Sequence, residues 1–195
     1  MARPRSFDED KVLRIARDQF WAKGYTATSV DDIAGATGLG KGSFYGAFGD
    51  KRKIFVRVFD QHGSALVESV RRSLEGPDEG ALDRLRTLVL GVADATADSS
   101  LRGCLIAKGT AELSEHDLQV RATAHRTFQA LGELLASSIA AAQRAGDLSR
   151  DADPARLAGL LLAVLRGIEA LGKADGSAQS LRMIAETALS LLPRP

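Results

Sequence analysis

Apolar residues recur every three or four positions along most of this chain, and short stretches rich in glycine, proline or acidic residues separate the apolar runs. Strand-like runs of alternating Val, Ile, Thr and Tyr are absent, so the spacing predicts an all-α fold. We expect about nine helices. They lie at about 8–23, 30–37, 41–47, from 50 to the loop EGPDEG, from 82 onward, within LRGCLIAKGTAEL, at about 115–145, from 154 onward and at about 178–192.

Residues with strong preferences for helix ends support these boundaries. Ser6 and Glu9 have the spacing of a capping box at the first helix, and Ser29 with Asp32 three residues on marks the second. Asp50 is expected to cap the fourth helix. Further end signals are Gly24, Gly38, Gly49 and Gly146 after helices, Pro154 at a first helical position and Ser177 as a cap.

The segment TSVDDIAGATGLGKGSFYGAFGDK, residues 28–51, contains two short predicted helices joined by a tight turn at Gly38–Leu39. This spacing is typical of a helix-turn-helix. Phe44 and Phe48 lie four apart on the second helix and are expected to anchor it inward. Its other residues are mostly small or polar, as in a recognition helix whose backbone must come close to base edges and phosphates.

The longer stretch FWAKGYTATSVDDIAGATGLGKGSFYGAFGDKRKIF, residues 20–55, resembles the DNA-binding domain of the tetracycline-repressor (TetR) family. The shared pattern is an aromatic and a charged residue, Gly-aromatic, Thr, Asp-Ile-Ala, Gly-Leu, Gly-x-Phe-Tyr and Phe-x-x-Lys. Gly46 departs from the pattern because a larger side chain, often histidine, is common there, and Gly40 stands where Ser often caps the recognition helix. The resemblance covers about a quarter of the chain; the remainder is similar only in length and helical layout.

The resemblance implies a three-helix helix-turn-helix DNA-binding domain in residues 1–50 and a larger helical ligand-binding and dimerisation domain in residues 51–195. The charge distribution has the sign expected of a DNA-binding head. Residues 1–53 carry ten Lys and Arg against seven Asp and Glu, whereas the rest of the chain carries sixteen against eighteen.

The resemblance further implies that Tyr45 and Lys51 hold phosphates of double-stranded DNA. Lys51 falls in the first turn of a helix, where free N–H groups also favour an anion. Thr28 and Ser29 are placed to donate to a phosphate across the groove. The predicted base contacts come from Lys41, with guanine as its partner, and from Ser43, while Gly42 permits close approach.

Arg3 and Arg5 flank Pro4 and form a short basic arm suited to the minor groove. Several of these residues also have a purely structural interpretation. The alternatives are helix caps for Ser29 and Asp50, a solvated tail for Arg3 and Arg5, surface charge for Lys41 and a packing role for Tyr45.

A single helix-turn-helix contacts few bases, so we expect a homodimer on a palindromic operator with half-sites about 34–36 Å apart. Apolar residues cover most of the circumference of the predicted helix at 154–173, which must therefore be buried on more than one side. The helix at 178–192 also has a broad apolar face. In the resembled family these two helices form a four-helix bundle with their mates; the alternative is that both belong to the internal core.

The resemblance also implies a pocket for an unknown small-molecule effector, enclosed by helices within roughly 80–145 and part of 154–173. Cys104, His125, Phe128 and Leu165 are chosen as candidates from their position and chemistry alone. His125 has the alternative of a core histidine, and Cys104 that of a small core residue rather than a redox sensor. Glu112 and His116 are four apart, but two ligands do not make a metal site, so no metal or cofactor is predicted.

Other function classes find little support. No glycine-rich loop follows a strand, no nucleophile motif is present and only three histidines occur, so the chain is not expected to be an enzyme. With one cysteine, no apolar run in MARPRSFDED and no apolar stretch longer than residues 157–165, we expect a cytosolic protein without a membrane span. The prediction is a ligand-responsive transcriptional repressor, with an activator of the same fold or a helical protein–protein adaptor as alternatives.

Overall fold

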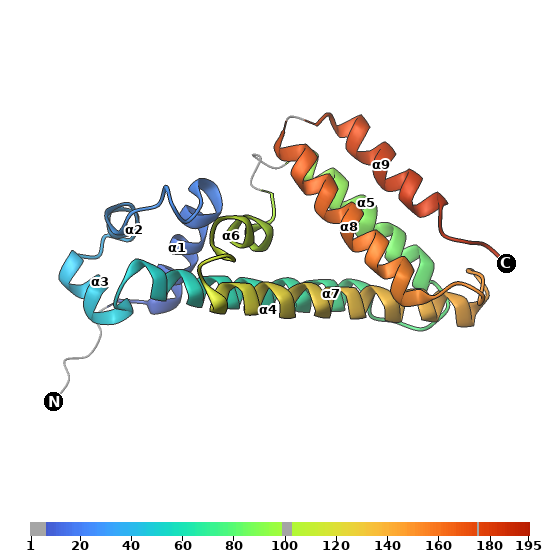
Figure 1. The fold of residues 1–195 in the computed structure, drawn as a ribbon, viewed down its shortest axis with the longest axis horizontal. Helices are drawn as coiled ribbons and strands as arrows, with labels where there is room; N and C mark the ends of the chain where they lie inside the picture. Colours follow the sequence, from blue (N-terminus) through green and yellow to red (C-terminus); the bar gives the residue numbers. More distant parts are fainter. Residues whose placement is uncertain (1–6, 99–102, 175) are drawn as a thin grey trace. The chain divides into compact units, whose positions relative to one another are not determined.

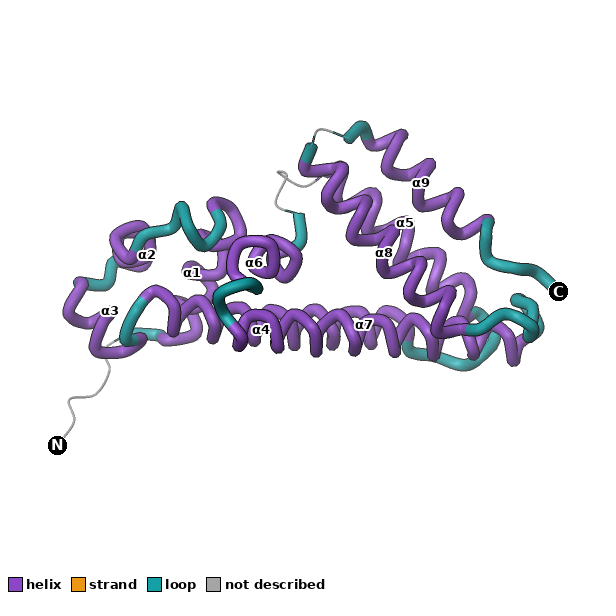
Figure 2. The backbone as a smooth tube through the Cα atoms, viewed as in Figure 1, coloured by secondary structure: helices purple, strands orange, loops and turns teal. Residues whose placement is uncertain are grey.

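The computed structural model describes residues 7–98, 103–174 and 176–195, and all regular elements in these ranges are α-helices, as predicted (Figures 1 and 2). The helices are α1 (Glu9–Lys23), α2 (Val30–Thr37), α3 (Lys41–Phe48), α4 (Lys51–Leu74), α5 (Ala81–Asp98), α6 (Leu105–Leu113), α7 (Leu118–Ala145), α8 (Pro154–Lys173) and α9 (Ala178–Ser190).

The predicted capping box at α2 is confirmed. Asp32 N donates to Ser29 Oγ at 3.0 Å, and Ser29 N donates back to Asp32 Oδ2 at 2.8 Å. The capping prediction at α1 is wrong. Its N-cap is Asp8, whose carboxylate accepts from Lys11 N at 3.0 Å, and Ser6 lies outside the described residues. Asp8 is itself a preferred N-cap residue, and it also places acidic residues in the first turn.

The described chain divides into two compact units. The first contains the described residues up to Gly63 together with Leu105–Ala124, and the second contains Ser64–Cys104 and His125–Pro195. Helices α4 and α7 each contribute a segment to both units. The unit that holds the helix-turn-helix is therefore larger than residues 1–50, because α6 and the beginning of α7 belong to it.

An aromatic cluster forms the core of the first unit. Phe20 and Phe55 meet edge to face with ring centroids 5.0 Å apart, and Phe59 stacks on Phe55 at 5.3 Å. Helix α6 packs closely on this cluster because it carries a glycine at the contact. A Cβ atom at Gly109 would lie 2.5 Å from the Phe59 ring, so any larger residue would force α6 outward.

The core of the second unit is formed mainly by α5, α8 and α9 (Figure 1), and buried residues of α7 belong to the same cluster. Buried aliphatic residues recur at helical spacing on the facing sides of the three helices, as the apolar periodicity predicted. They include Leu85 and Val89 on α5, Leu161, Leu165 and Ile168 on α8, and Leu181, Ala185 and Leu189 on α9.

The burial of one histidine in the first unit generates a pH-dependent stability. His62 packs edge to face on Trp21 with ring centroids 4.9 Å apart, and burial, assisted by the charge of Arg17, lowers the pKa of its imidazole to about 4. The unfolded chain takes up this proton at about pH 6.5, before the folded protein does. The free energy of unfolding should therefore fall as the pH is lowered from about 6.5 to 4, by up to about 3 kcal/mol.

Urea denaturation at several pH values, compared between the wild type and His62→Phe, measures how much His62 contributes to the pH dependence of the free energy of unfolding. The substitution should flatten the pH dependence in that window. His125→Phe is the matched control, because His125 is exposed, and it should retain the wild-type slope. Parallel curves for the wild type and His62→Phe would show that His62 does not carry the effect.

Candidate nucleic-acid interface

Helices α2 and α3 are joined by a short turn. Gly38 adopts φ +71°, and Leu39 N donates to Ala34 O at 3.2 Å. This left-handed conformation is accessible to glycine without strain, as the sequence predicted for the turn. Phe44 is fully buried and Phe48 is 6% exposed, so the predicted inward anchor of α3 is confirmed.

The opposite side of α3 is open to solvent. Tyr45 is 51% exposed, and its ring packs edge to face on Phe44 with centroids 5.7 Å apart. A Cβ atom placed at Gly42 or at Gly46 would meet nothing within 4 Å. Neither glycine is therefore required by packing within the protein, although each costs about 1 kcal/mol in a helix interior relative to alanine. Bare backbone on the exposed side is suited to close approach by an external partner.

Lys51 begins α4 and lies next to the helix-turn-helix. Its Nζ donates to Tyr25 O at 3.1 Å and lies 4.2 Å from the centroid of the Tyr25 ring. These contacts fix the ammonium at the N-terminus of α4, where Lys53 N is capped by Asp50 Oδ1 at 2.8 Å. The fixed charge and the helix N-terminus together favour a neighbouring anion.

The prediction that Thr28 donates to a phosphate is wrong. Thr28 is fully buried, and its hydroxyl donates to Gly24 O at 2.6 Å, so it closes the connection between α1 and α2 from inside. Ser29 is exposed, but its hydroxyl donates to Asp32 Oδ2 at 2.5 Å in addition to capping α2. Arg3 and Arg5 lie outside the described residues.

Lys41, the first residue of α3, is paired within the helix-turn-helix. Its Nζ lies 2.8 Å from Asp31 Oδ1 and donates to Asp31 Oδ2 at 3.0 Å. This hydrogen bond, together with the carboxylate charge, raises the pKa of Lys41. Ser43 is exposed on the same helix. Sequence reasoning missed Asp31, because a side-chain contact between two helices leaves no mark in local spacing.

Side chains of α6 contact the end of α1 and the loop that connects α1 to α2. Lys108 Nζ donates to Trp21 O and Ala22 O, both at 3.1 Å, in the last turn of α1. Glu112 Oε2 accepts from Thr26 N at 2.9 Å. These contacts pair a cation with the negative end of α1 and satisfy an amide in the loop, so α6 supports the start of the helix-turn-helix.

A further ion pair fixes the beginning of α4. Arg52 donates twice to the carboxylate of Asp117, at 2.6 and 3.0 Å, and Asp117 is only 7% exposed. Asp117 also accepts from Gln119 N at 3.0 Å at the start of α7. The hydrogen bond from Arg52 holds the pKa of Asp117 below its usual range against the opposing effect of burial. Sequence reasoning did not identify this pair, whose members are far apart in the chain.

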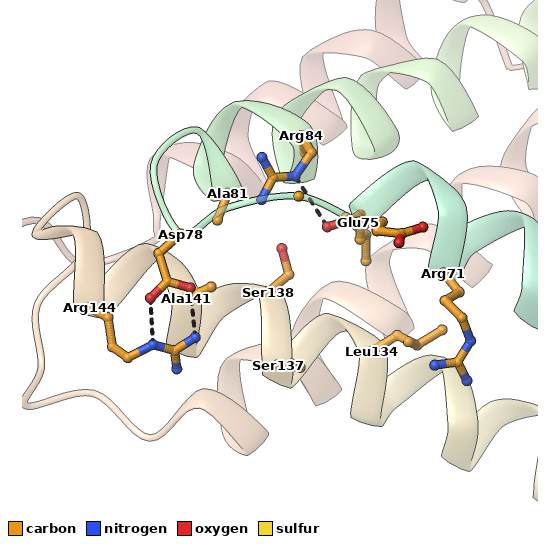
Figure 3. Close-up of a pocket in the computed structure, with 12 residues that line it drawn as sticks. Arg71, Glu75, Asp78, Ala81, Arg84, Leu134, Ser137, Ser138, Ala141 and Arg144 are labelled. Carbon is orange, nitrogen blue, oxygen red and sulfur yellow. Dashed lines mark hydrogen bonds and ion pairs between the residues drawn. The ribbon is translucent and has the colours of Figure 1, made fainter.

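The second unit contains a hollow of about 390 Å³ between the end of α4, the loop after it, the start of α5 and α7 (Figure 3). Asp78 and Arg144 pair across it at 2.6 and 2.8 Å. Figure 3 shows Ser138 pointing from α7 toward the loop between α4 and α5. The Ser138 hydroxyl is buried and has no hydrogen-bond partner in the described chain. It is a free donor and acceptor beside the hollow.

None of the four predicted ligand-binding residues lines this hollow. His125 is exposed and Phe128 half-buried on α7, whereas Leu165 is 4% exposed in the core between α5, α8 and α9. Cys104 is buried, and its Sγ accepts from Arg166 Nη1 at 3.0 Å. Within the described residues no cluster of His, Cys, Asp and Glu is suited to a metal ion. No helix there is both long and apolar enough to cross a membrane.

Large apolar side chains remain exposed on α8 and α9. Leu160 and Leu171 are 47% and 49% exposed, and their spacing of eleven residues puts both on one side of α8. Met183 on α9 and Leu191, directly after the end of α9, are 58% and 64% exposed. The inward side of each helix is already in the core, so this second apolar side is available to another surface.

In the described residues α2, the tight turn at Gly38 and the exposed side of α3 form a helix-turn-helix, the arrangement found in many DNA-binding regulators. The profile described as "Bacterial regulatory proteins, tetR family" matches residues 12–58, and the one described as "Tetracyclin repressor-like, C-terminal domain" matches residues 81–188. The chain belongs to the TetR family of transcriptional regulators.

Similar proteins support this assignment. The chain is 26% identical over 192 residues to the HTH-type transcriptional repressor ComR of Escherichia coli, which covers 98% of this chain and 91% of the relative. It is 30% identical over 148 residues to the repressor DhaR of Mycobacterium sp., covering 76% and 73%. A cysteine-substituted form of the TetR-family regulator CifR, solved with 26-base-pair operator DNA, superposes with a TM-score of 0.82 at 26% identity, covering 98% and 100%.

The support from α6 can be tested without DNA. Removing the carboxylate with Glu112→Ala leaves Thr26 N without its acceptor, which should cost about 1 kcal/mol of local stability and speed its amide exchange about fivefold. Hydrogen–deuterium exchange resolved to residues 24–29 measures the change. Glu115→Ala, at an exposed position just after α6, is the control and should leave this segment at the wild-type rate. Equal exchange in both variants would contradict the role given to Glu112.

Proposed function

We propose that this protein represses transcription by binding a palindromic operator as a homodimer, and that a small molecule releases it from DNA. The observation that carries the proposal is the exposed side of α3. Tyr45 is half exposed there beside Gly42 and Gly46, whose surroundings are open, while Phe44 and Phe48 fix the helix from behind. A protein–protein adaptor would not need two glycines on the exposed side of one eight-residue helix.

In the proposed complex α3 enters the major groove. Tyr45 and Lys51 contact phosphates, which fixes the position of the helix without reading sequence. Lys41 and Ser43 face base edges, and Gly42 lets the backbone approach. The arm that carries Arg3 and Arg5 is proposed to reach the adjacent minor groove.

Ser29 is proposed to contribute mainly as the cap of α2. Its hydroxyl already donates to Asp32, so a phosphate would have to compete with a charged acceptor. The backbone amides at the N-terminus of α2 favour an anion, but the carboxylates of Asp31 and Asp32 in the same turn oppose one. The proposed role of Ser29 is therefore to hold the end of α2 in place.

The effector is proposed to bind in the second unit. The hollow of Figure 3 offers the unused hydroxyl of Ser138. Arg84 also lines it, but its guanidinium already donates to the backbone carbonyls of Leu74, Pro77 and Glu79 and holds the loop between α4 and α5. Cys104, His125, Phe128 and Leu165 remain proposals from sequence for the same role. Helices α4 and α7 have segments in both units, so an effector that favours one arrangement of the second unit acts on helices that also belong to the unit with the helix-turn-helix.

Selection of bound sequences from random duplex DNA, followed by fluorescence anisotropy on the selected site, tests the proposal. A palindromic sequence should emerge, with two protomers bound per site and affinity falling steeply with salt. A small-molecule screen for release from that site then seeks the effector. Failure to enrich any sequence, with no salt-sensitive binding to duplex DNA, would refute the DNA-binding function.

Substitutions of the two phosphate contacts should weaken binding to every duplex alike. Tyr45→Phe keeps the ring and removes the hydroxyl, and should weaken binding about tenfold. Lys51→Ala should in addition lower the slope of log affinity against log salt by about one. Anisotropy titrations at several salt concentrations measure both. Arg86→Ala, which removes an exposed cation on α5, should leave affinity and slope unchanged. A changed sequence preference in Tyr45→Phe or Lys51→Ala, without weaker binding, would contradict these roles.

The dimer is proposed to form through the exposed apolar sides of α8 and α9. Leu160→Glu combined with Leu171→Glu would bury charge in that interface and should give a monomer at micromolar concentration, measured by sedimentation. Leu118→Glu is the matched control, because Leu118 is 70% exposed on α7, and it should leave the dimer intact. A monomeric wild type, or a dimer that survives the double substitution, would exclude this interface.

A further inference from the structure

The first turn of α2 carries two neighbouring carboxylates that make different contacts. Asp32 caps α2 with Ser29 and accepts from Lys23 Nζ at 2.7 Å, so it joins α2 to α1. Asp31 reaches the other way, to Lys41 at the start of α3. The ammonium of Lys41 lies 2.8 and 3.0 Å from the two oxygens of Asp31, and both side chains are about two-thirds exposed, at 65% and 66%.

Neither stability nor overall affinity explains the carboxylate of Asp31. An ion pair this exposed contributes at most about 1 kcal/mol to folding, and α3 is already fixed by Phe44 and Phe48. A negative charge beside the helix that approaches DNA also opposes the phosphate backbone, which supplies most of the non-specific affinity. The carboxylate therefore lowers general attraction to DNA.

We propose that Asp31 is a positioning residue for sequence reading, which holds the ammonium of Lys41 between α2 and α3 and withdraws it from the phosphates. This inference rests on the proposed DNA-binding function. A lysine side chain is long and flexible, and without a partner it finds the nearest phosphate on any duplex. The ammonium has three donor hydrogens, so it can keep one on Asp31 and offer others to acceptors on a base edge.

The pair therefore separates two kinds of contact. Movement of Lys41 to a phosphate breaks the hydrogen bond to Asp31. On non-cognate DNA the favourable contact with the phosphate is therefore offset by the loss of the ion pair. Contact with guanine O6 and N7 in the major groove leaves the bond in place, because the ammonium does not have to leave the side of α3 that faces the groove. Asp31 thus lowers the affinity for random DNA and thereby increases the ratio of operator affinity to random-DNA affinity.

The test compares affinities for the selected operator and for a random duplex, over a range of salt concentrations. Asp31→Ala should raise affinity for the random duplex about threefold to tenfold, steepen its salt slope by about one, and lower the selectivity ratio by a similar factor. Asp31→Glu, which keeps a carboxylate one methylene further out, should recover part of the ratio. Glu115→Ala removes an exposed carboxylate elsewhere in the first unit and should leave the ratio unchanged.

The decisive arm is a double-mutant cycle with Lys41→Ala. If Asp31 acts through Lys41, Asp31→Ala in the Lys41→Ala background should leave the selectivity ratio within twofold. An equal fall of the ratio in both backgrounds would show a general charge effect and overturn the proposal, as would an unchanged ratio in the single variant. A wild type without affinity for any duplex refutes the proposed function, whereas a selective wild type insensitive to Asp31→Ala refutes only this inference. Circular dichroism checks that each variant is folded. We expect native spectra, because an exposed ion pair contributes little to stability.

Discussion

The burial of Phe44 is the interaction on which the candidate site depends. Helix α3 has eight residues, two interior glycines and no side-chain cap at Gly40. A peptide of this length and composition does not form a stable helix in water. The exposed side therefore keeps its geometry only because the inward side is locked into the core, where Phe44 is fully buried and meets Phe48 with centroids 5.6 Å apart.

This dependence explains why the compact unit extends beyond the helix-turn-helix. Helices α2 and α3 have only eight residues each, and the aromatic cluster of the unit needs a further helix to cover it. Helix α6 supplies that wall, with Gly109 against Phe59, and its Lys108 and Glu112 hold the α1–α2 connection. This arrangement connects the two units along the chain. The helix that completes the DNA-binding unit, α6, is followed directly by α7, whose later residues belong to the second unit.

Local signals in the sequence were sufficient for the elements and for the side of α3 that faces outward. Ser29, Asp50 and the turn at Gly38 each act within three or four residues, so spacing alone reveals them. The family resemblance added the roles of Tyr45 and Lys51, which spacing does not give.

Contacts between residues far apart in the chain could not be predicted in this way. The bonds of Glu112 to Thr26 and of Arg52 to Asp117 join segments that only the fold brings together. Thr28 was assigned to DNA because a hydroxyl at a helix start is a good phosphate donor. The structure shows that the same hydroxyl is needed inside, where an unpaired Gly24 carbonyl would be costly.

The ion pairs of the first unit change the meaning of its charge balance. Residues 1–53 carry a formal excess of three positive charges, but Lys23, Lys41 and Arg52 are each held by a carboxylate. The cations that remain for phosphates are fewer than the composition suggests, and Lys51 is fixed in place by carbonyl and ring contacts rather than by an acid. Such a surface relies on few, well-placed contacts instead of on a broad positive field. In the proposed complex, weak attraction to arbitrary DNA would leave the geometry of α3 to determine where the protein binds, which is the property that a regulator of particular operators requires.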